Sequence, residues 1–308
     1  MTKSNFYFIS ADEHSKISCV KYVPDGKPKA ILQISHGMME MISRYDDFAK
    51  YLCENGILVA GNDHIGHGES VASKDDFGYW DCKDAGAVIV SDLHKITTII
   101  KKDYPDIPYF VLGHSMGSFM IRRYLTKYSH EINGAIVMGT GNQSDLLVAT
   151  GQVLAGTIAK IRGDRYRSEL VRSIAFAGYD SRIPKEPDAG NWQTRDMEIL
   201  KDIMNRPECT FTFTASAYKH MFDTIRYVTN KKNIAKVRKD LPIMVISGAE
   251  DPVGEYGKGV LKAYKAYKER GIEDLVINLI PDMRHEVLNE IGRDEVYRYI
   301  LDWIEERI

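Results

Sequence analysis

Short, continuous apolar runs alternate along this chain with longer segments in which apolar residues recur every three or four positions. The short runs predict buried strands, and the longer segments predict amphipathic helices. Strands and helices that alternate in this way are typical of a parallel sheet with helices on both faces. Ser43 and Asp46 have the spacing of a capping box, which predicts the start of the first helix. Strands are predicted at 30–34, 57–60, 109–112, 135–138, 243–247 and 275–280, and helices at 44–54, 85–102, 119–128, 260–268 and 296–304.

Two departures from the alternation define the expected domain organisation. Apolar runs at 6–9 and 17–22 flank a polar turn and predict a β-hairpin. Between residues 141 and 236 the alternation stops, and the pattern is mainly helical with a few loops. The simplest account is a core formed by 1–140 and 237–308, interrupted by a helical insertion at 141–236.

The most informative motif lies at the end of the strand predicted at 109–112. That strand runs into Gly113 to Gly117, read as GHSMG, and a helical segment follows. G-x-S-x-G between a strand and a helix is the pattern of a nucleophile elbow, a tight turn that exposes the serine hydroxyl. Both glycines have a steric reason, because a Cβ atom at either position would collide with neighbouring backbone. Ser115 is therefore the predicted nucleophile.

A serine hydroxyl becomes a good nucleophile only when a base removes its proton and a third group orients that base. Around a nucleophile elbow these groups follow in the chain order serine, acid, histidine, each in a loop after a strand. Asp251 follows the second-last predicted strand and His285 follows the last one. We therefore expect His285 to be the base and Asp251 to orient it. Glu250 and Asp282 are the competing acids.

Acyl transfer also needs an oxyanion hole, in which two backbone N–H groups face the oxygen that becomes negatively charged. One donor is the residue after the nucleophile, here Met116, and the other lies in the loop after an earlier strand. That loop begins His36-Gly37-Met38, so Met38 is the expected second donor. Only the backbone is used, so an apolar side chain is acceptable at both positions.

Together these residues resemble the α/β-hydrolases of the monoacylglycerol lipase and lysophospholipase type, which are related to the serine aminopeptidases. The resemblance covers nearly the whole chain. It implies an α/β-hydrolase fold, with a mostly parallel central sheet flanked by helices and an inserted, mainly helical cap over the active site. The segments that carry it are His36-Gly37 with Arg44-Tyr45, Asp63 to Ser70 (DHIGHGES), Gly113 to Gly117, Gly248 to Val253, and Arg284-His285-Glu286.

The resemblance also implies an activity, the hydrolysis of carboxylic esters of acyl lipids through an acyl-enzyme on Ser115, with no metal or organic cofactor. One alternative is an aminopeptidase-like serine hydrolase, which needs an acidic group in its pocket for the substrate ammonium. A non-catalytic relative that binds a small ligand is a second alternative, although such proteins usually lose a member of the triad. Haloalkane dehalogenases and epoxide hydrolases are disfavoured because their elbow nucleophile is an aspartate.

The oxyanion loop departs from the family pattern. The family often reads His-Gly-x-Gly-Glu-His there, whereas this chain has Met39 and Met41 in place of the second glycine and the second histidine. The two methionines leave the backbone N–H of Met38 available as a donor. We expect them to affect the shape of the loop and the fit of the substrate.

The cap is where the resemblance implies substrate selection. Leu147, Leu154, Ile158 and Ile161 share one helical face. This face either packs on the core or lines an acyl-chain tunnel and touches membrane lipid. Further residues that could line the same pocket are Trp192, Phe211, Phe213, Tyr218, Met221 and Phe222.

Three other histidines have unremarkable interpretations. His64 and His67 could suggest a metal pair, but no carboxylate or cysteine completes a site, and the resemblance implies a structural loop. His114, next to the nucleophile, is expected to pack or form hydrogen bonds without transferring protons.

Composition excludes several classes of function. The 41 basic and 43 acidic residues give a net charge of −2, which provides no basic footprint for nucleic acid. The four cysteines show no C-x-x-C spacing and predict separate reduced thiols rather than a zinc site or disulfides. Neither a signal-peptide pattern nor a long apolar run is present, so the expected protein is soluble and cytoplasmic, with at most transient membrane contact through the cap.

Overall fold

A computed structural model describes all residues of the chain except residue 187. Its centre is a sheet of eight strands in the order β1-β2-β4-β3-β5-β6-β7-β8. β1 and β2 form an antiparallel hairpin, β2 pairs antiparallel with β4, and all the remaining neighbours are parallel. The strands are β1 (Thr2–Ile9), β2 (Lys16–Val23), β3 (Ala30–Ser35), β4 (Ile57–Asn62), β5 (Tyr109–His114), β6 (Gly134–Met138), β7 (Ile243–Gly248) and β8 (Leu275–Ile280).

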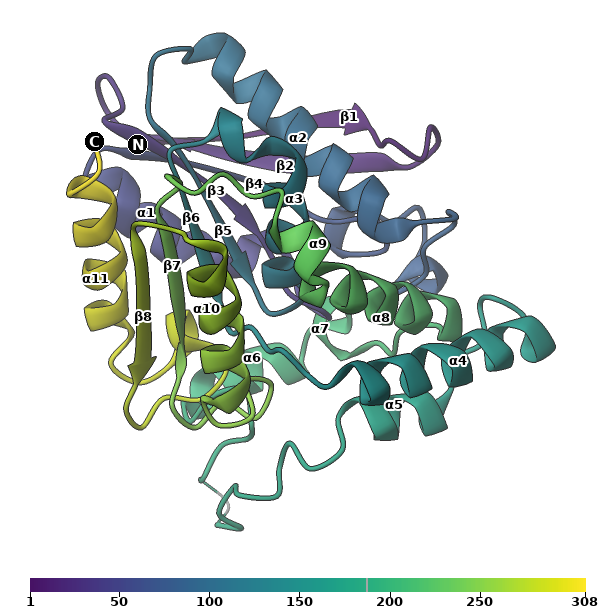
Figure 1. The fold of residues 1–308 in the computed structure, drawn as a ribbon. Coiled ribbons are helices and arrows are strands. Elements are labelled where there is room, and N and C mark those ends of the chain that lie inside the picture. Colours follow the sequence, from purple (N-terminus) through teal and green to yellow (C-terminus); the bar gives the residue numbers. More distant parts are fainter. Residues whose placement is uncertain (187) are drawn as a thin grey trace.

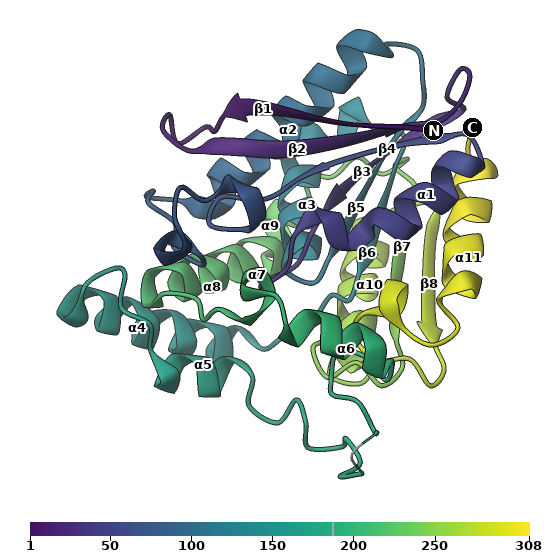
Figure 2. The same cartoon turned by 180° about the vertical axis from the view of Figure 1, so that it is seen from behind.

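Helices cover both faces of this sheet (Figures 1 and 2). α1 and α11 pack on one face and share an apolar core with it. α2, α3 and α10 share a second core with the other face. The predicted fold class, a mostly parallel sheet flanked by helices, is confirmed. These helices are α1 (Asp46–Glu54), α2 (Ala85–Asp103), α3 (Met116–Tyr128), α10 (Lys258–Arg270) and α11 (Arg293–Glu305).

The predicted capping box at the start of α1 is wrong. Ser43 lies in a 3₁₀ turn, Ile42–Tyr45, and the cap residue of α1 is Tyr45, which makes no side-chain capping bond. The side chain of Asp46 points elsewhere, to the Tyr22 hydroxyl and the Lys3 ammonium. A tertiary contact with the hairpin therefore replaces the local one.

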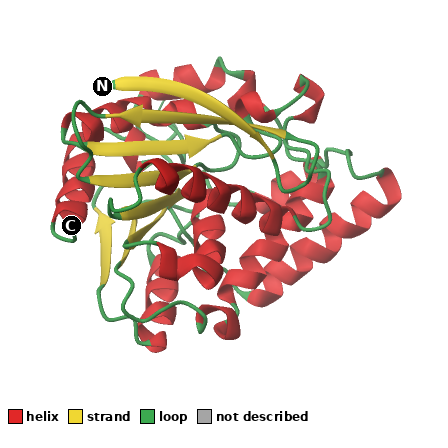
Figure 3. Cartoon of the chain, turned by 90° about the horizontal axis from the view of Figure 1, so that it is seen from above, coloured by secondary structure: helices red, strands yellow, loops and turns green. Residues whose placement is uncertain are grey.

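The stretch between β6 and β7 consists of helices and loops, and its described residues contain no strand. Figure 3 shows these helices gathered beside the sheet. α8 packs against α4 on one side and against α2 and α3 on the other. No helix in the described part of the chain combines the length and hydrophobicity needed to cross a membrane. The helices are α4 (Asp145–Arg162), α5 (Glu169–Ala175), α6 (Met197–Met204), α7 (Pro207–Thr210), α8 (Ala215–Thr229) and α9 (Lys231–Ile234).

Candidate active site

Ser115 occupies a strained turn between β5 and α3. Its φ and ψ angles are 52° and −118°, a conformation that side-chain-bearing residues rarely adopt. A Cβ atom on Gly113 would collide with the carbonyl of Gly117, and one on Gly117 would collide with the carbonyl of Ser35. The two glycines therefore let β5, α3 and the end of β3 approach closely. This approach holds Ser115 at the carboxyl edge of the sheet.

Asp251 and His285 meet at the same edge, after β7 and β8. Nδ1 of His285 lies 3.0 Å from Oδ1 of Asp251, and both side chains are buried. The ring N–H is not aligned for a linear hydrogen bond. Such misalignment is common in catalytic pairs without substrate. Asp251 also accepts hydrogen bonds from the Ser247 hydroxyl (2.7 Å) and the Val253 N–H (2.8 Å). The site thus holds the carboxylate from three directions.

The charge state of Asp251 follows from these contacts. Burial alone would raise the pKa of the Asp251 carboxyl, but His285, Ser247 and Val253 together outweigh burial and lower it. The competing acids are placed differently, since Glu250 and Asp282 are both exposed. Glu250 lies 3.8 Å from the Arg284 guanidinium.

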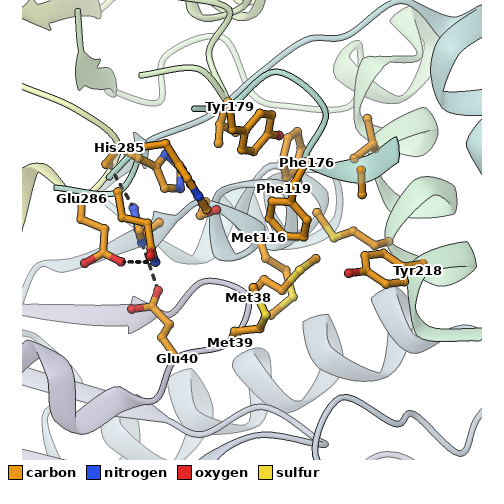
Figure 4. A pocket seen from close by; sticks show the side chains of 18 of the residues that line it. Met38, Met39, Glu40, Met116, Phe119, Phe176, Tyr179, Tyr218, His285 and Glu286 are labelled. Atoms are coloured by element: carbon orange, nitrogen blue, oxygen red, sulfur yellow. Dashed lines mark hydrogen bonds and ion pairs between the residues drawn. The ribbon is translucent and has the colours of Figure 1, made fainter. Parts of the chain in front are cut away.

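Ser115 and His285 line one cavity, roofed by residues from α5 and α8 (Figure 4). The space beside two glycines, Gly37 and Gly139, shows how close the walls of the cavity lie to each other. A Cβ atom built on Gly37 would lie 3.1 Å from the Cβ of Ser115, and one on Gly139 would lie 3.0 Å from Cε1 of His285. The ends of β3, β5 and β6 therefore meet the histidine loop at this point.

The two expected oxyanion donors lie after β3 and directly after Ser115. Met38 and Met116 both line the cavity, and their amide N–H groups have no hydrogen-bond partner among the described residues. Met39 adopts a left-handed φ of 55°, so a methionine occupies the conformation that a glycine would take without strain. Met41 turns away and packs against Leu200 of α6.

Comparison with known proteins places the chain in a family. The sequence profile of the family described as "Serine aminopeptidase, S33" matches residues 26–292. The chain belongs to this family. It is 40% identical over 168 residues to the monoglyceride lipase of Rattus norvegicus, covering 54% of this chain and 50% of that one. It is 30% identical over 288 residues to a monoacylglycerol lipase of Mycolicibacterium smegmatis, covering 92% and 90%.

A solved structure supports the same placement. The thermostable carboxyl esterase of Bacillus coagulans superposes with a TM-score of 0.92 at 27% identity, covering 100% of this chain and 99% of that one. The chain spans half or less of the length of several curated relatives that it matches.

This S33 family member has a buried charge network behind its candidate triad, which the sequence analysis did not identify. The Arg44 guanidinium lies between two carboxylates, 3.1 Å from Glu40 and 2.6 Å from Glu286. Glu40 also contacts Nδ1 of His114 at 3.0 Å, and Nε2 of His114 lies 3.3 Å from the carbonyl oxygen of His285. The network therefore reaches the backbone of the candidate base.

The network fixes the charges of its members. Burial would raise the pKa of Glu40 and Glu286, but contacts with His114 and Arg44 lower both. Burial would lower the pKa of His114, but the Glu40 contact raises it. The contacts of His114 with Glu40 and with the His285 carbonyl are the hydrogen bonds that the sequence predicts for it. The sequence signal for the network was that all four members, Glu40, Arg44, His114 and Glu286, lie in the family segments.

The loop before α6 holds the histidine loop from the other side. The Trp192 ring lies 5.2 Å from the His285 ring, and the Glu286 N–H donates to the Gln193 carbonyl at 2.8 Å. The Arg284 guanidinium donates to the carbonyls of Ala189 (2.6 Å) and Asn191 (2.8 Å). A segment far away in sequence thus helps to position His285.

The predicted cap residues divide into two groups. Trp192 and Met221 line the cavity, as do Tyr218 and Phe222. Leu147, Leu154, Ile158 and Phe213 do not. Leu147 is 58% exposed, Leu154 and Ile158 pack against the main core, and Phe213 is fully buried in it. The helical face of α4 therefore points partly to the core and partly outward, and Phe119, Phe176 and Tyr179 line the cavity instead.

His64 and His67 lie with His36 in a buried network of loop residues. His64 contacts the Ser35 hydroxyl at 3.0 Å through Nε2, and its backbone N–H donates to Nε2 of His36 at 3.0 Å. Nδ1 of His67 lies 2.9 Å from the Ile65 carbonyl. Across the described residues, no group of three or more His, Cys, Asp or Glu side chains is arranged to hold a metal ion.

Proposed function

We propose that this protein is a serine hydrolase that cleaves carboxylic esters of acyl lipids, of the monoacylglycerol or lysophospholipid type. The observation that carries the proposal is the single cavity in which Ser115, His285 and the free amides of Met38 and Met116 meet an apolar lining. The names of the rat and mycobacterial relatives and of the Bacillus esterase support the same chemistry.

In the proposed reaction His285 removes the hydroxyl proton of Ser115 as the oxygen attacks the ester carbonyl. The negatively charged oxygen of the tetrahedral intermediate receives hydrogen bonds from the Met38 and Met116 amides. His285 then gives its proton to the departing alcohol, which leaves an acyl-enzyme on Ser115. Water, deprotonated by His285, attacks this ester, and His285 returns the proton to the Ser115 oxygen as the acid is released. Asp251 orients the imidazole and stabilises its charged form throughout.

We propose further that helices α4 to α9, within residues 141–236, act as the cap over this site. The side chains that this segment contributes to the cavity are mainly apolar and aromatic, with two uncharged amides, which suits an acyl chain rather than a charged group. The members from this segment that line it are Gln143, Ala175, Phe176, Tyr179, Trp192, Gln193, Tyr218, Met221, Phe222 and Ile225.

The pairing of the acidic groups argues against the aminopeptidase alternative. Such an enzyme needs a carboxylate free to bind the ammonium of its substrate. Glu40 and Glu286 are the carboxylates on the described cavity wall, and both already contact Arg44. An incoming ammonium would therefore have to displace an existing buried ion pair.

A substrate panel tests the proposed function. Esters of p-nitrophenol with graded acyl lengths should be hydrolysed alongside monoacylglycerol and lysophospholipid, whereas aminoacyl anilides should not. Turnover of the anilides at rates above those of the esters would overturn the ester assignment. If Ser115→Ala retained the ester activity of the wild type, the proposed mechanism would be wrong.

An exposed apolar surface on α4 and α5 supports the proposal that the cap touches lipid. Leu146, Val153 and Ile161 of α4 are 79%, 67% and 74% exposed, and Leu170 of α5 is 57% exposed. Exposed apolar patches of this kind mark sites of lipid or protein contact. The triple substitution of the three α4 residues by serine should reduce co-flotation with phosphatidylcholine vesicles while sparing hydrolysis of short, water-soluble esters. Unchanged flotation would refute lipid contact through this face.

A further inference from the structure

Two polar atoms that line the cavity have neither a hydrogen-bond partner among the described residues nor a role in the proposed reaction, the Gln143 amide oxygen and the Tyr218 hydroxyl. The Gln143 side chain is held through its amide nitrogen, which donates to the Val253 carbonyl at 3.1 Å, whereas the Tyr218 side chain has no other polar atom. Tyr218 of α8 lines the cavity and is 1% exposed, and its hydroxyl has no hydrogen-bond partner among the described residues. The ring packs against Phe213, with ring centroids 5.7 Å apart. The hydroxyl end points toward the side chains of Met38 and Met39, and so into the cavity (Figure 4).

A buried hydroxyl without a partner is unfavourable. Most buried polar side chains form at least one hydrogen bond, and each exception calls for a physical reason. Phenylalanine would fill the same space in this apolar wall without that cost. Burial also raises the pKa of Tyr218, so the hydroxyl keeps its proton and can both donate and accept. A ligand that brings an oxygen atom to this point would remove the cost.

The position of Tyr218 shows which part of the substrate would meet it. His285 must hand its proton to the departing alcohol, so the alcohol lies at the His285 end of the cavity. Figure 4 shows Tyr218 at the opposite end, with Met116 and Phe119 between the two. The acyl group, which stays on Ser115, is therefore the part that extends toward Tyr218.

We infer that Tyr218 is a specificity-determining residue that favours acyl groups bearing an oxygen substituent, such as a hydroxyl or keto group, along the chain. This inference rests on the proposed ester hydrolysis and adds the chemical class of the preferred acyl group. The oxygen of the substituent pairs with the Tyr218 hydroxyl, while the rest of the chain contacts the apolar wall. An unsubstituted chain leaves the hydroxyl unpaired. A substituent at a different depth does not reach the Tyr218 hydroxyl.

A positional series of esters tests this inference. p-Nitrophenyl esters of one chain length, either unsubstituted or with a single hydroxyl moved carbon by carbon, are compared by kcat/KM. The wild type should show one preferred position, at which the hydroxylated ester exceeds its neighbours by about 3- to 10-fold, the range of a typical net hydrogen bond. In Tyr218→Phe that preference should disappear.

Tyr109→Phe is the matched control. Tyr109 is also a buried tyrosine, but its hydroxyl donates to Gln33 at 2.6 Å, away from the cavity. This variant should keep the positional preference and melt at a lower temperature than the wild type, whereas Tyr218→Phe should melt at the same or a higher temperature. A melting temperature of Tyr218→Phe as low as that of the control would mean that the Tyr218 hydroxyl has a structural partner, and would overturn the inference.

The outcomes separate this inference from the proposed function. A flat positional profile in a wild type that hydrolyses esters through Ser115, or a peak that survives in Tyr218→Phe, would overturn only the role of Tyr218. A change in Tyr218→Phe that is confined to selectivity among alcohol groups would overturn it as well. Equal hydrolysis of the whole series by Ser115→Ala would instead overturn the proposed function.

Discussion

The two walls of the cavity differ in whether their polar side chains have partners. On the wall built from strand ends, the buried carboxylates are paired: Asp251 accepts from Ser247 and Val253, and Arg44 joins Glu40 and Glu286. On the wall built from α5 and α8, the side chains are mainly apolar and the Tyr218 hydroxyl has no partner.

The difference teaches how the two tasks of such a site are divided. Reacting groups must be held within a fraction of an ångström, which paired and buried polar groups achieve. Acyl groups of varied shape need contact without fixed geometry, which apolar side chains supply. On this account, substitutions on the strand wall should impair chemistry or stability, and those on the helical wall should change substrate preference.

The largest expected effect is on kcat, when the Asp251 carboxylate is replaced by an amide of the same size. Asp251→Asn should lower kcat for a short ester by about 10³- to 10⁴-fold, because the amide no longer stabilises the charged imidazole and favours the wrong tautomer. Steady-state kinetics near neutral pH measures the loss. Asp282→Asn, an exposed acid in the histidine loop, is the control and should change kcat little. Equal losses in both variants would contradict the assignment of Asp251.

The next effect concerns stability rather than chemistry. Arg44→Met should lower the free energy of unfolding by about 3–5 kcal/mol, because it leaves two buried carboxylates without their cation. Lys231→Met removes an exposed ion pair with Glu269 (3.2 Å) and should cost less than about 1 kcal/mol. Urea unfolding of the two variants measures both values. A loss in Arg44→Met no larger than in Lys231→Met would show that the network does not stabilise this wall.

The smallest effect is a pH dependence that originates at His114. Its pKa is raised in the folded protein, mainly by Glu40, so its contribution to stability is complete below the unfolded pKa of about 6.5 and is lost as pH rises through the folded pKa. The difference in unfolding free energy between the wild type and His114→Gln should therefore shrink as pH rises above about 6.5. Urea unfolding at a series of pH values measures it. A difference that stays constant or grows would be incompatible with a charged His114–Glu40 pair.

The strand wall was largely predictable from the sequence, and the helical wall was not. Ser115, Asp251 and His285 each follow an apolar strand, and parallel strands bring their carboxyl ends to one edge, so local pattern and chain order were sufficient to predict that they lie at the same edge. The pairing of Arg44 with Glu286 joins residues 242 positions apart, and no local pattern encodes it.

Helical periodicity shows that a face is apolar but not what that face touches. The sequence left open whether the face with Leu154 and Ile158 lines the pocket or packs on the core, and these two residues pack against the core because α4 lies against α8. Phe176 and Tyr179 line the cavity from the end of α5 and the turn after it, where no periodic pattern exists. The orientation of each helix on the core decides which side chains reach the cavity.

The most direct test of the account is to locate the nucleophile. The protein is treated with a fluorophosphonate probe, digested, and mapped by mass spectrometry, with Ser115→Ala treated in parallel. The account predicts a single modified peptide that contains Ser115, and no modification and no ester hydrolysis in Ser115→Ala. Labelling at another residue, or labelling and hydrolysis that persist in Ser115→Ala, would contradict it.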